Sequence, residues 1–511
     1  MKLQVGLIGI QPGYKIILEQ VGIPYTIIPF EQEISKTEYP VLIIDYLLPE
    51  YDWKKIVDYV REGGTLLINS DSYNKIFQEE IKFKKVKYLI SQKNSIYSEI
   101  GLVDIYRKIS YPKSDTVEPV DINLYIFAKR LEHGKIFVLP FSVNELLVDW
   151  GSKRKKFYAK RKELPSEIVA TVSKNKIREI VRVSLEHLFH SQNLPFISKL
   201  YYPNGNEKAF LFRVDTDFCS QNDAEEFYEI CKNHGINSTW FVDTESKERV
   251  KNFYSKLSAE IALHCKEHKI FKDYEKNYNN IKSGIADLQD AGIETKGFAA
   301  PFGEWNPALA KVLEDFGFEY SSEFTIDYDN FPFYPYYKNK FSRVLQIPIH
   351  PVSLGRLRRS HFKQEEMLNY YKWVLQKKNS KFEPVIFYHH PHHRNFSVFD
   401  KLFNHVSASD FWNPTFHEFS EWWGKRNQIS LDPKYKDGKI FINKDYGDYI
   451  KISTDQKNFK ILKAKPEIEI DQLRLNKKSQ DDYPPDIAKI RDFTWRDLLY
   501  NFETWRAKKK R

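Results

Sequence analysis

The sequence predicts an α/β protein with more than one domain. The chain has 511 residues, which is too long for one ordinary hydrophobic core. Two regions alternate short apolar segments with amphipathic ones, and a later region alternates apolar with polar residues. We therefore expect four consecutive segments: a doubly wound domain (1–150), a basic linker and helix (151–199), a deformed β/α barrel (200–426), and a small β-rich domain with a C-terminal helix (427–511).

The first segment is predicted from five apolar runs that read as buried parallel strands. They are residues 3–10, 25–30, 41–48, 64–70 and 134–141. Residues 50–64 form an amphipathic pattern ended by glycine, which predicts a helix. The pattern resembles the glutamine-amidotransferase-like (flavodoxin-like) domains attached to some carbohydrate-active enzymes. The region contains no cysteine, so that family's nucleophile is absent, and no GxGxxG follows the first strand. A scaffold or binding role is expected.

Basic runs distinguish the linker and the last residues. The net charge is +10, and much of the excess lies in "KRKKFYAKRK" (153–162) and "RAKKKR" (506–511). Such runs can contact phosphates, nucleic acid or an anionic membrane surface, or they can be solvated segments without a dedicated partner. No aromatic-basic sheet face or nucleic-acid-binding fold accompanies them, so a specific nucleic-acid partner is not expected. A helix is predicted over roughly 165–190.

The later segments follow from the same patterns. Six strand-like runs separated by helical stretches predict the barrel: 209–218, 237–243, 259–268, 295–303, 343–351 and 383–393. Residues 438–464 alternate apolar and polar with turn signals, which predicts antiparallel strands. The start of the chain lacks the layout of a signal peptide, and no apolar run reaches the length of a membrane span. We expect a cytoplasmic location.

The stretch "FLFRVDTDFCS" (210–220) carries the first chemical signal. Side chains alternate along a strand, so Arg213, Asp215 and Asp217 share one face. Two carboxylates on a buried face repel each other and are costly to desolvate. A metal ion would offset that cost. The alternative is a strand that runs into a capped turn, where aspartate is also favoured.

Histidines supply matching ligands farther along. In "HCKEH", His264 and His268 are four residues apart and would face one side of a helical turn. One carboxylate and two imidazoles suit Zn²⁺ first, and also Co²⁺, Ni²⁺ or Fe²⁺. A second cluster, "HHPHH" (389–393), ends another strand, and its alternative reading is a surface patch or satisfied loop histidines. In a β/α barrel, functional groups collect at the carboxyl ends of strands.

In this order, DxD, HxxxH, PFG and HHP resemble the polysaccharide deacetylases of carbohydrate esterase family 4, over roughly residues 205–425. The resemblance implies Asp215 as base, Asp217, His264 and His268 as metal ligands, His390 as acid, and the Phe302 backbone N–H as an oxyanion donor. It also implies Asp327 or Asp329 as the partner that orients His390. Trp240 and Trp305 adjoin these motifs and could stack on a sugar, although core packing is the better reading of Trp240.

Two departures from the family pattern bear on activity. The arginine of the third motif is Ala299 here, and a leucine that lines the acetate pocket is Tyr388. Arg213 lies two residues from Asp215 and could supply the missing cation; alternatively it pairs with a carboxylate on a helix. The leading hypothesis is a metal-dependent hydrolase that removes acetyl groups from N-acetylated sugars of a polysaccharide or its precursor. The alternative is a catalytically impaired protein of the same fold that binds glycan.

Overall fold

The computed structural model describes residues 1–46, 52–113, 115–443, 446–456, 458–471, 473, 476–477, 490–492 and 494–509. The chain divides into two compact units, each built from three separate stretches. The first unit comprises Met1–Asp149, Val172–Gly205 and Lys425–Pro485, and the second comprises Trp150–Thr171, Asn206–Gly424 and Asp486–Arg511. The four consecutive segments expected from the sequence stay a prediction as folding domains.

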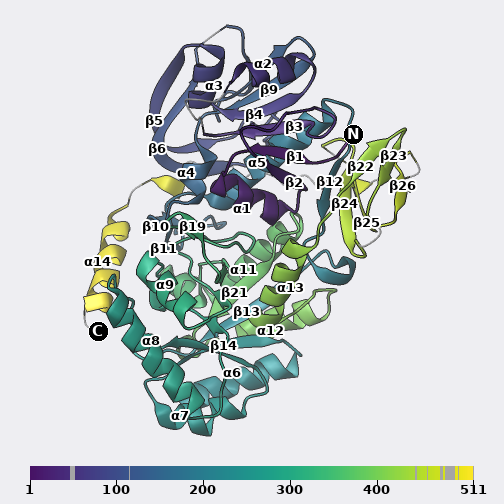
Figure 1. Ribbon diagram of the computed structural model, residues 1–511. Coiled ribbons are helices and arrows are strands. Elements are labelled where there is room, and N and C mark those ends of the chain that lie inside the picture. Colours follow the sequence, from purple (N-terminus) through teal and green to yellow (C-terminus); the bar gives the residue numbers. More distant parts are fainter. Residues whose placement is uncertain are drawn as a thin grey trace. The chain divides into compact units, whose positions relative to one another are not determined.

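The first unit contains a seven-stranded sheet in the order β2-β1-β3-β4-β9-β8-β7 (Figure 1). The strands are β1 (Val5–Ile8), β2 (Tyr25–Ile28), β3 (Val41–Ile44), β4 (Thr65–Asn69), β7 (Glu118–Asp121), β8 (Ile126–Leu131) and β9 (Gly134–Leu139). The first four and β9 pair in parallel, as the five apolar runs predict, and β8 and β7 add an antiparallel edge. The parallel order is that of flavodoxin-like sheets, but a flavodoxin-like class for this region stays a prediction. Residues 47 and 48 of the third run lie outside the described residues.

Four helices and a hairpin complete the first part of this unit. They are α1 (Pro12–Val21), α2 (Lys54–Arg61), α3 (Ser70–Phe77), α4 (Val143–Leu147) and the unpredicted pair β5 (Ile81–Ile90) and β6 (Leu102–Pro112). Helix α2 lies within the predicted range 50–64. The helix expected over 165–190 is α5 (Lys174–His190), and it is shorter because residues 166–170 form a strand.

The remaining strands of this unit form two antiparallel sheets. One has the order β12-β24-β25-β27, from β12 (Phe196–Lys199), β24 (Tyr449–Ser453), β25 (Asn458–Lys463) and β27 (Asn476–Lys477). The other has the order β22-β23-β26, from β22 (Lys434–Lys436), β23 (Lys439–Phe441) and β26 (Glu467–Glu469). The antiparallel pairing expected over 438–464 is present. Because β12 pairs with β24, the sheet draws a strand from outside the last segment, and a separate C-terminal domain stays a prediction.

The second unit is built on a curled, fully parallel sheet in the order β20-β17-β16-β15-β14-β13-β21. Its strands are β13 (Phe210–Asp215), β14 (Ser238–Asp243), β15 (Glu260–Cys265), β16 (Gly297–Phe298), β17 (Tyr320–Ser321), β20 (Leu345–Gln346) and β21 (Val385–His389). Among the described residues, β20 and β21 do not pair with each other. The expected deformed barrel is therefore a half-barrel with two open edges.

Helices cover the outside of this sheet (Figure 1). They include α6 (Gln221–Asn233), α8 (Tyr274–Gln289), α9 (Pro307–Asp315), α11 (Gln364–Asn379) and α12 (Ser397–Ser407). Helix α8 packs against β15 and α11 against β21. Every residue of β13 and β14 is buried, as expected for strands covered on both faces. Trp240 on β14 belongs to this core, and its indole N–H donates to Ser238 Oγ at 3.0 Å.

The first part of the basic run at 153–162 forms a strand and not a solvated segment. It contributes β10 (Ser152–Lys156), which forms an antiparallel hairpin with β11 (Ser166–Ala170). Lys155 is buried and lies 3.3 Å from the hydroxyl of Tyr328. Arg154 donates to helix α14 (Trp495–Lys509). These two cations have partners inside the second unit, so the solvated reading does not hold for this part of the run, and the basic linker expected over 151–199 stays a prediction. In the described part of the chain, no helix is long and apolar enough to cross a membrane.

Candidate active site

The carboxyl end of β13 holds the first group of functional side chains. Arg213 Nε donates to Asp215 Oδ1 at 2.6 Å, and Nη2 donates to Oδ2 at 2.7 Å. The third nitrogen, Nη1, donates to the carbonyl oxygen of Ser322 at 2.6 Å. Both side chains are almost fully buried. Asp217 follows two residues later at the same end of the sheet. The arginine thus pairs along its own strand and not with a carboxylate on a helix.

This pairing decides the charge of Asp215. Burial by itself would raise the pKa of this carboxyl, but the Arg213 guanidinium, followed by His264, holds the pKa below its ordinary value. The guanidinium also lies 5.0 Å from the ring centre of Phe241 and 5.6 Å from that of Tyr388. Aromatic faces stabilise a cation that has lost its water. Asp215 is therefore a carboxylate at neutral pH and can accept a proton.

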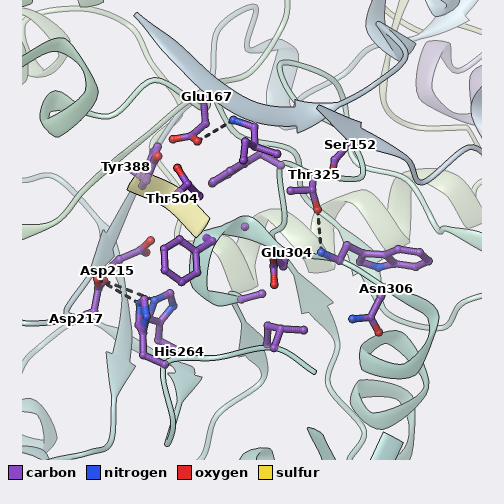
Figure 2. A pocket seen from close by; sticks show the side chains of 18 of the residues that line it. Ser152, Glu167, Asp215, Asp217, His264, Glu304, Asn306, Thr325, Tyr388 and Thr504 are labelled. Atoms are coloured by element: carbon purple, nitrogen blue, oxygen red, sulfur yellow. Dashed lines mark hydrogen bonds and ion pairs between the residues drawn. The ribbon is translucent and has the colours of Figure 1, made fainter. Parts of the chain in front are cut away.

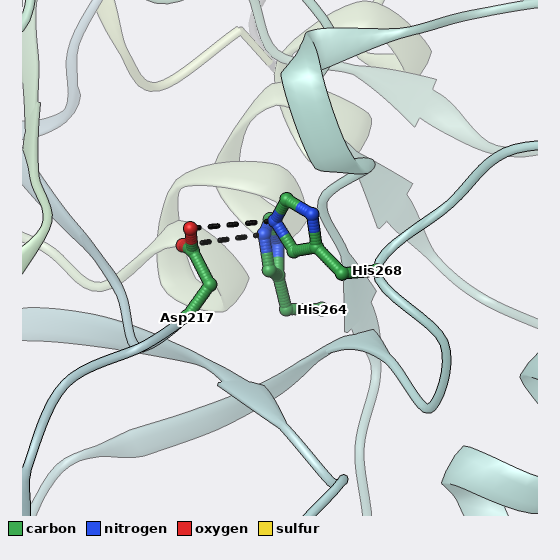
Figure 3. Close-up of side chains that lie close together, drawn as sticks. All are labelled: Asp217, His264 and His268. Carbon is green, nitrogen blue, oxygen red and sulfur yellow. Dashed lines mark ion pairs between the residues drawn. The ribbon is translucent and has the colours of Figure 1, made fainter. Parts of the chain in front are cut away.

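His264 and His268 converge on Asp217 from one side (Figure 3). His264 Nε2 lies 3.6 Å from Asp217 Oδ1, and His268 Nε2 lies 3.3 Å from Oδ2. The helical turn expected for this pair is absent. His264 lies on β15, and His268 lies in the loop that follows, beyond Cys265 with its φ of +118°. The end of a strand and a sharp bend, not a helix face, bring the two imidazoles together.

These three residues fit a divalent metal ion. Ligand atoms about 2.1 Å from a tetrahedral ion lie about 3.4 Å from one another, which matches the separations of 3.3 and 3.6 Å. Asp217 Oδ1 is buried without a hydrogen-bond partner among the described residues, and such an atom is costly unless something binds it. Burial lowers the pKa of His264 to about 4, so this imidazole is neutral, as a metal ligand must be.

The histidine cluster after β21 divides into different environments. His390 Nε2 lies 3.5 Å from Asp217 Oδ1 and 3.8 Å from Asp215 Oδ2, so His390 belongs to the site. His392 Nδ1 lies 2.9 Å from the backbone oxygen of Asp217. His389 instead points into the core and packs beside Phe399. The cluster is therefore not a surface patch.

The expected orienting partner of His390 is not provided by either candidate. Asp329 accepts hydrogen bonds from His350 and lies 3.0 Å from the Lys378 ammonium. Asp327 accepts from the side-chain amide of Asn330 at 2.8 Å. His390 Nδ1 is buried and has no hydrogen-bond partner within the described residues. Neither aspartate holds the histidine through that nitrogen.

The third motif lies at the end of β16. Ala299 is fully buried, and its N–H donates to the carbonyl of Leu263 at 3.0 Å, so no cation occupies the position of the family arginine. Phe302 lines the same cavity as the histidines, and its ring lies 5.3 Å from that of His268. The role of its N–H as an oxyanion donor stays a prediction.

Three residues at this edge of the sheet have positive φ angles, which also occur at other positions of the described chain. Phe218 (φ +59°), Cys265 (φ +118°) and Phe302 (φ +57°) follow or end β13, β15 and β16, and all adopt left-handed backbone conformations. Such conformations cost about 1–3 kcal/mol each in residues other than glycine and concentrate at functional sites. No periodicity or motif in the sequence revealed this strain.

A cavity of about 950 Å³ opens over these residues (Figure 2). Asp215, Asp217 and His264 lie to one side of the view and Asn306 to the other. Trp150 and Trp305 also line the cavity, with ring centres 6.4 Å apart. The sequence did not predict the rest of the wall, which includes the ion pair between Glu167 and Arg356, together with Glu503 and Thr504 of α14. These residues come from segments that only the fold brings together.

Residues 204–321 match the family model of polysaccharide deacetylases. This match lies almost entirely within the second unit and supports a deacetylase domain there. A comparison with curated proteins finds no match to the chain.

Several solved structures are similar to part of the chain. One is a protein from Mycobacterium smegmatis with a provisional assignment as a polysaccharide deacetylase (17% identity, 45% of this chain, 95% of that chain, TM-score 0.39). Another is a pseudoenzyme of carbohydrate esterase family 4 from Bacillus anthracis (16% identity, 43% of this chain, 66% of that chain, TM-score 0.31). A third is a family 4 carbohydrate esterase from the same organism (12% identity, 43% of this chain, 86% of that chain, TM-score 0.29).

Proposed function

We propose that the deacetylase domain is a metal-dependent hydrolase that removes acetyl groups from N-acetylated sugars of a polysaccharide or its precursor. The observation that carries this proposal is the convergence of two imidazoles on Asp217, beside the carboxylate of Asp215 that Arg213 holds ionised. The match of residues 204–321 to the deacetylase family supports the choice of reaction.

Asp217, His264 and His268 would hold the metal ion. Their one oxygen and two nitrogen donors suit Zn²⁺, and they also accept Co²⁺, Ni²⁺ or Fe²⁺. When bound, the ion supplies Lewis acidity, which lowers the pKa of water and makes it a nucleophile near neutral pH.

The remaining residues then handle protons and charge. Asp215 accepts a proton from the attacking water, whose oxygen bonds to the acetyl carbonyl carbon. The Phe302 N–H donates a hydrogen bond to the oxyanion that develops. His390 gives a proton to the amide nitrogen as the carbon–nitrogen bond breaks. The products are acetate and a free amino sugar, and one water is consumed.

The second candidate is a catalytically impaired protein that binds glycan through the same cavity. The specific observation in its favour is Ala299, which offers no cation at the position of the family arginine. Arg213 argues against it, because a guanidinium already contacts both oxygens of Asp215 from another position.

Acetate release separates the two candidates. The full chain loaded with Zn²⁺ is incubated with N-acetylglucosamine oligomers, beside Asp215→Asn and a matched control, Asp410→Asn, whose carboxylate is exposed and pairs with Lys208. We expect acetate from the wild type and the control, and loss of acetate on chelation or in Asp215→Asn. Oligomer binding without acetate release from any variant would favour the second candidate.

A further inference from the structure

His390 lacks the partner that would fix its imidazole ring. Its Nε2 lies 3.5 Å from Asp217 Oδ1 and 3.8 Å from Asp215 Oδ2, so this nitrogen faces the site. The other nitrogen, Nδ1, is buried and has no hydrogen-bond partner among the described residues. A buried polar atom without a partner is costly, and the hydrogen bond at one ring nitrogen sets the proton on the other. Asp327 and Asp329, which were expected to supply that bond, bind other groups.

His393 has a buried nitrogen in the same condition. It ends the short 3₁₀ turn Pro391–His393, and its Nδ1 is also buried without a hydrogen-bond partner in the part of the chain that the structure describes. The ring centres of His390 and His393 lie 5.2 Å apart, and both side chains line the cavity. His392 is the less suitable partner, because its Nδ1 already lies 2.9 Å from the backbone oxygen of Asp217. Two neighbouring imidazoles thus each leave one nitrogen unsatisfied.

A glycine makes room for the His393 ring. Gly355 lies in helix α10 (Leu354–Arg359), and a Cβ atom added there would overlap this ring, at 2.7 Å from Nδ1 and 2.8 Å from Nε2. Burial, followed by the neighbouring imidazoles of His390 and His392, keeps the pKa of His393 well below its ordinary value. The ring is therefore neutral, and a neutral imidazole with its proton on Nε2 offers Nδ1 as an acceptor.

We propose that His393 is the positioning residue of His390, in the role that the sequence assigned to an aspartate. His390 Nδ1–H donates a hydrogen bond to one water molecule, which donates in turn to His393 Nδ1. Such a bridge satisfies two buried polar groups at once. It fixes the ring so that Nε2 stays aimed at the leaving amide nitrogen. Because His393 is neutral, it orients the acid without adding a negative charge to the site. The inference rests on the proposed hydrolase function.

Two substrates test this role in the full chain loaded with Zn²⁺. Acetate release from N-acetylglucosamine oligomers needs a proton for the leaving amine, whereas 4-nitrophenyl acetate releases a phenolate that needs none. We expect His393→Leu, which removes the acceptor, to lower kcat on the oligomers by about tenfold to a hundredfold. Its hydrolysis of the ester and its metal content should stay within about twofold of the wild type. His393→Asn keeps an acceptor near the position of Nδ1 and should recover most of the activity.

A variant outside the histidine separates positioning from loss of structure. Gly355→Ala keeps His393 but displaces its ring, so it should show the same selective loss on the oligomers. The matched control is His234→Gln, because that histidine pairs with Asp400 and does not line the cavity. This control should behave like the wild type. Equal losses on the oligomers and the ester, or full activity in His393→Leu, would overturn the inference.

A spectroscopic measurement tests the inference even if the wild type releases no acetate, a result that would contradict the proposed function on its own. In the Zn²⁺-loaded chain labelled with ¹⁵N-histidine, the ring signals of His390 are those missing from His390→Gln. We expect a proton held on Nδ1 in the wild type and in His393→Asn, and exchange between the two tautomers in His393→Leu. The same tautomer in all three proteins would overturn the positioning role of His393.

Discussion

Arg213 and Asp215 face each other through two parallel hydrogen bonds, from Nε to Oδ1 at 2.6 Å and from Nη2 to Oδ2 at 2.7 Å. This fork-to-fork geometry is the strongest that an arginine and a carboxylate can adopt. The two residues are neighbours on the same face of one strand, and Ala299 contributes no cation to the site. We therefore expect Arg213 to be the positioning residue of the proposed base.

Replacing Arg213 should move the pH profile of the reaction. With the guanidinium gone, the effect of burial on Asp215 is no longer offset by a neighbouring cation, so the pKa of this carboxyl rises and the base becomes ionised only at higher pH. We expect Arg213→Ala to retain its metal, to lose activity at neutral pH, and to shift the acid limb of kcat/KM upward. Arg213→Lys keeps the positive charge but cannot form the two parallel hydrogen bonds. Its activity at neutral pH should therefore lie between that of the wild type and that of Arg213→Ala. Adding Ala299→Arg to Arg213→Ala should restore part of the activity. An unchanged pH profile in Arg213→Ala would show that the base needs no neighbouring cation.

Metal content should depend on each of the three proposed ligands. Asp217→Ala, His264→Ala and His268→Ala should each lose most of the bound ion, because a site with three protein ligands cannot lose one without a large drop in affinity. Mass spectrometry of the purified proteins measures the content. His234→Ala is the control, since that histidine lies on another part of the second unit and pairs with Asp400. Near-normal metal in all three ligand variants would contradict the assignment.

Base and ligand can be told apart by isosteric amides. Asp215→Asn should keep the metal and lose about 10²–10⁴ in turnover, because general acid–base groups contribute that much. Asp217→Asn should lose the metal. If the two variants show the reverse pattern, the roles of the two aspartates are exchanged.

Glu323 should make stability depend on pH. This side chain is fully buried next to the third motif, where Ala300 N–H donates to Oε1 at 3.1 Å, and burial raises the pKa of Glu323 from 4.5 to about 7. A raised pKa in the folded state means that stability is complete below about pH 4.5 and is lost as pH rises through 7. The loss is roughly 3 kcal/mol at most.

The variant Glu323→Gln cannot ionise, so its free energy of unfolding should fall less than that of the wild type between pH 5 and pH 8. Urea denaturation at both pH values measures this difference. Glu319→Gln, at a half-exposed position, should keep the wild-type dependence. Parallel pH dependence in Glu323→Gln and the wild type would show that Glu323 is already ionised in the folded protein.

Trp150 should affect substrate binding more than chemistry. Its indole is half exposed and lines the cavity with Trp305, and aromatic faces stack on sugar rings. We expect Trp150→Ala to raise KM for longer oligomers by about threefold to tenfold with little change in kcat. Trp495→Ala, at a far more exposed tryptophan (82%) that does not line the cavity, should leave KM for soluble oligomers unchanged. A fall in kcat alone would place Trp150 outside the substrate path.

The sequence predicted the parallel strands and the residues that converge at their ends. The apolar strand pattern and the order of the motifs were enough to predict that Asp215, Asp217 and His390 lie close together, because parallel strands place their carboxyl ends at one edge of the sheet. The helical turn assigned to His264 and His268 was wrong, since four-residue spacing does not distinguish a helix from a strand that ends in a bend. Asp327 and Asp329 were predicted as partners of His390 from motif order alone. Asp329 instead accepts a hydrogen bond from His350 and forms an ion pair with Lys378.

The strand at the start of the basic run was not predicted, for a related reason. Composition indicates that Arg154, Lys155 and Lys156 are charged, but not that a tertiary fold places carboxylates, hydroxyls and carbonyls around them. Lys155 is buried against Tyr328, and Arg154 holds α14. Contacts between residues 173 and 350 positions apart leave no periodic signal in one sequence.

The contact between Arg154 and Thr504 also dictates an order of assembly. These residues are separated by 350 positions, and Thr504 lines the cavity whose other walls come from residues 150–393. During synthesis, the ribosome must deliver the chain through Thr504 before this wall can close. The curled sheet can form early around β13 to β21, whereas the cavity acquires its final shape only after translation has passed α14. A nascent chain arrested before residue 495 would therefore carry the three proposed metal ligands in an incomplete cavity.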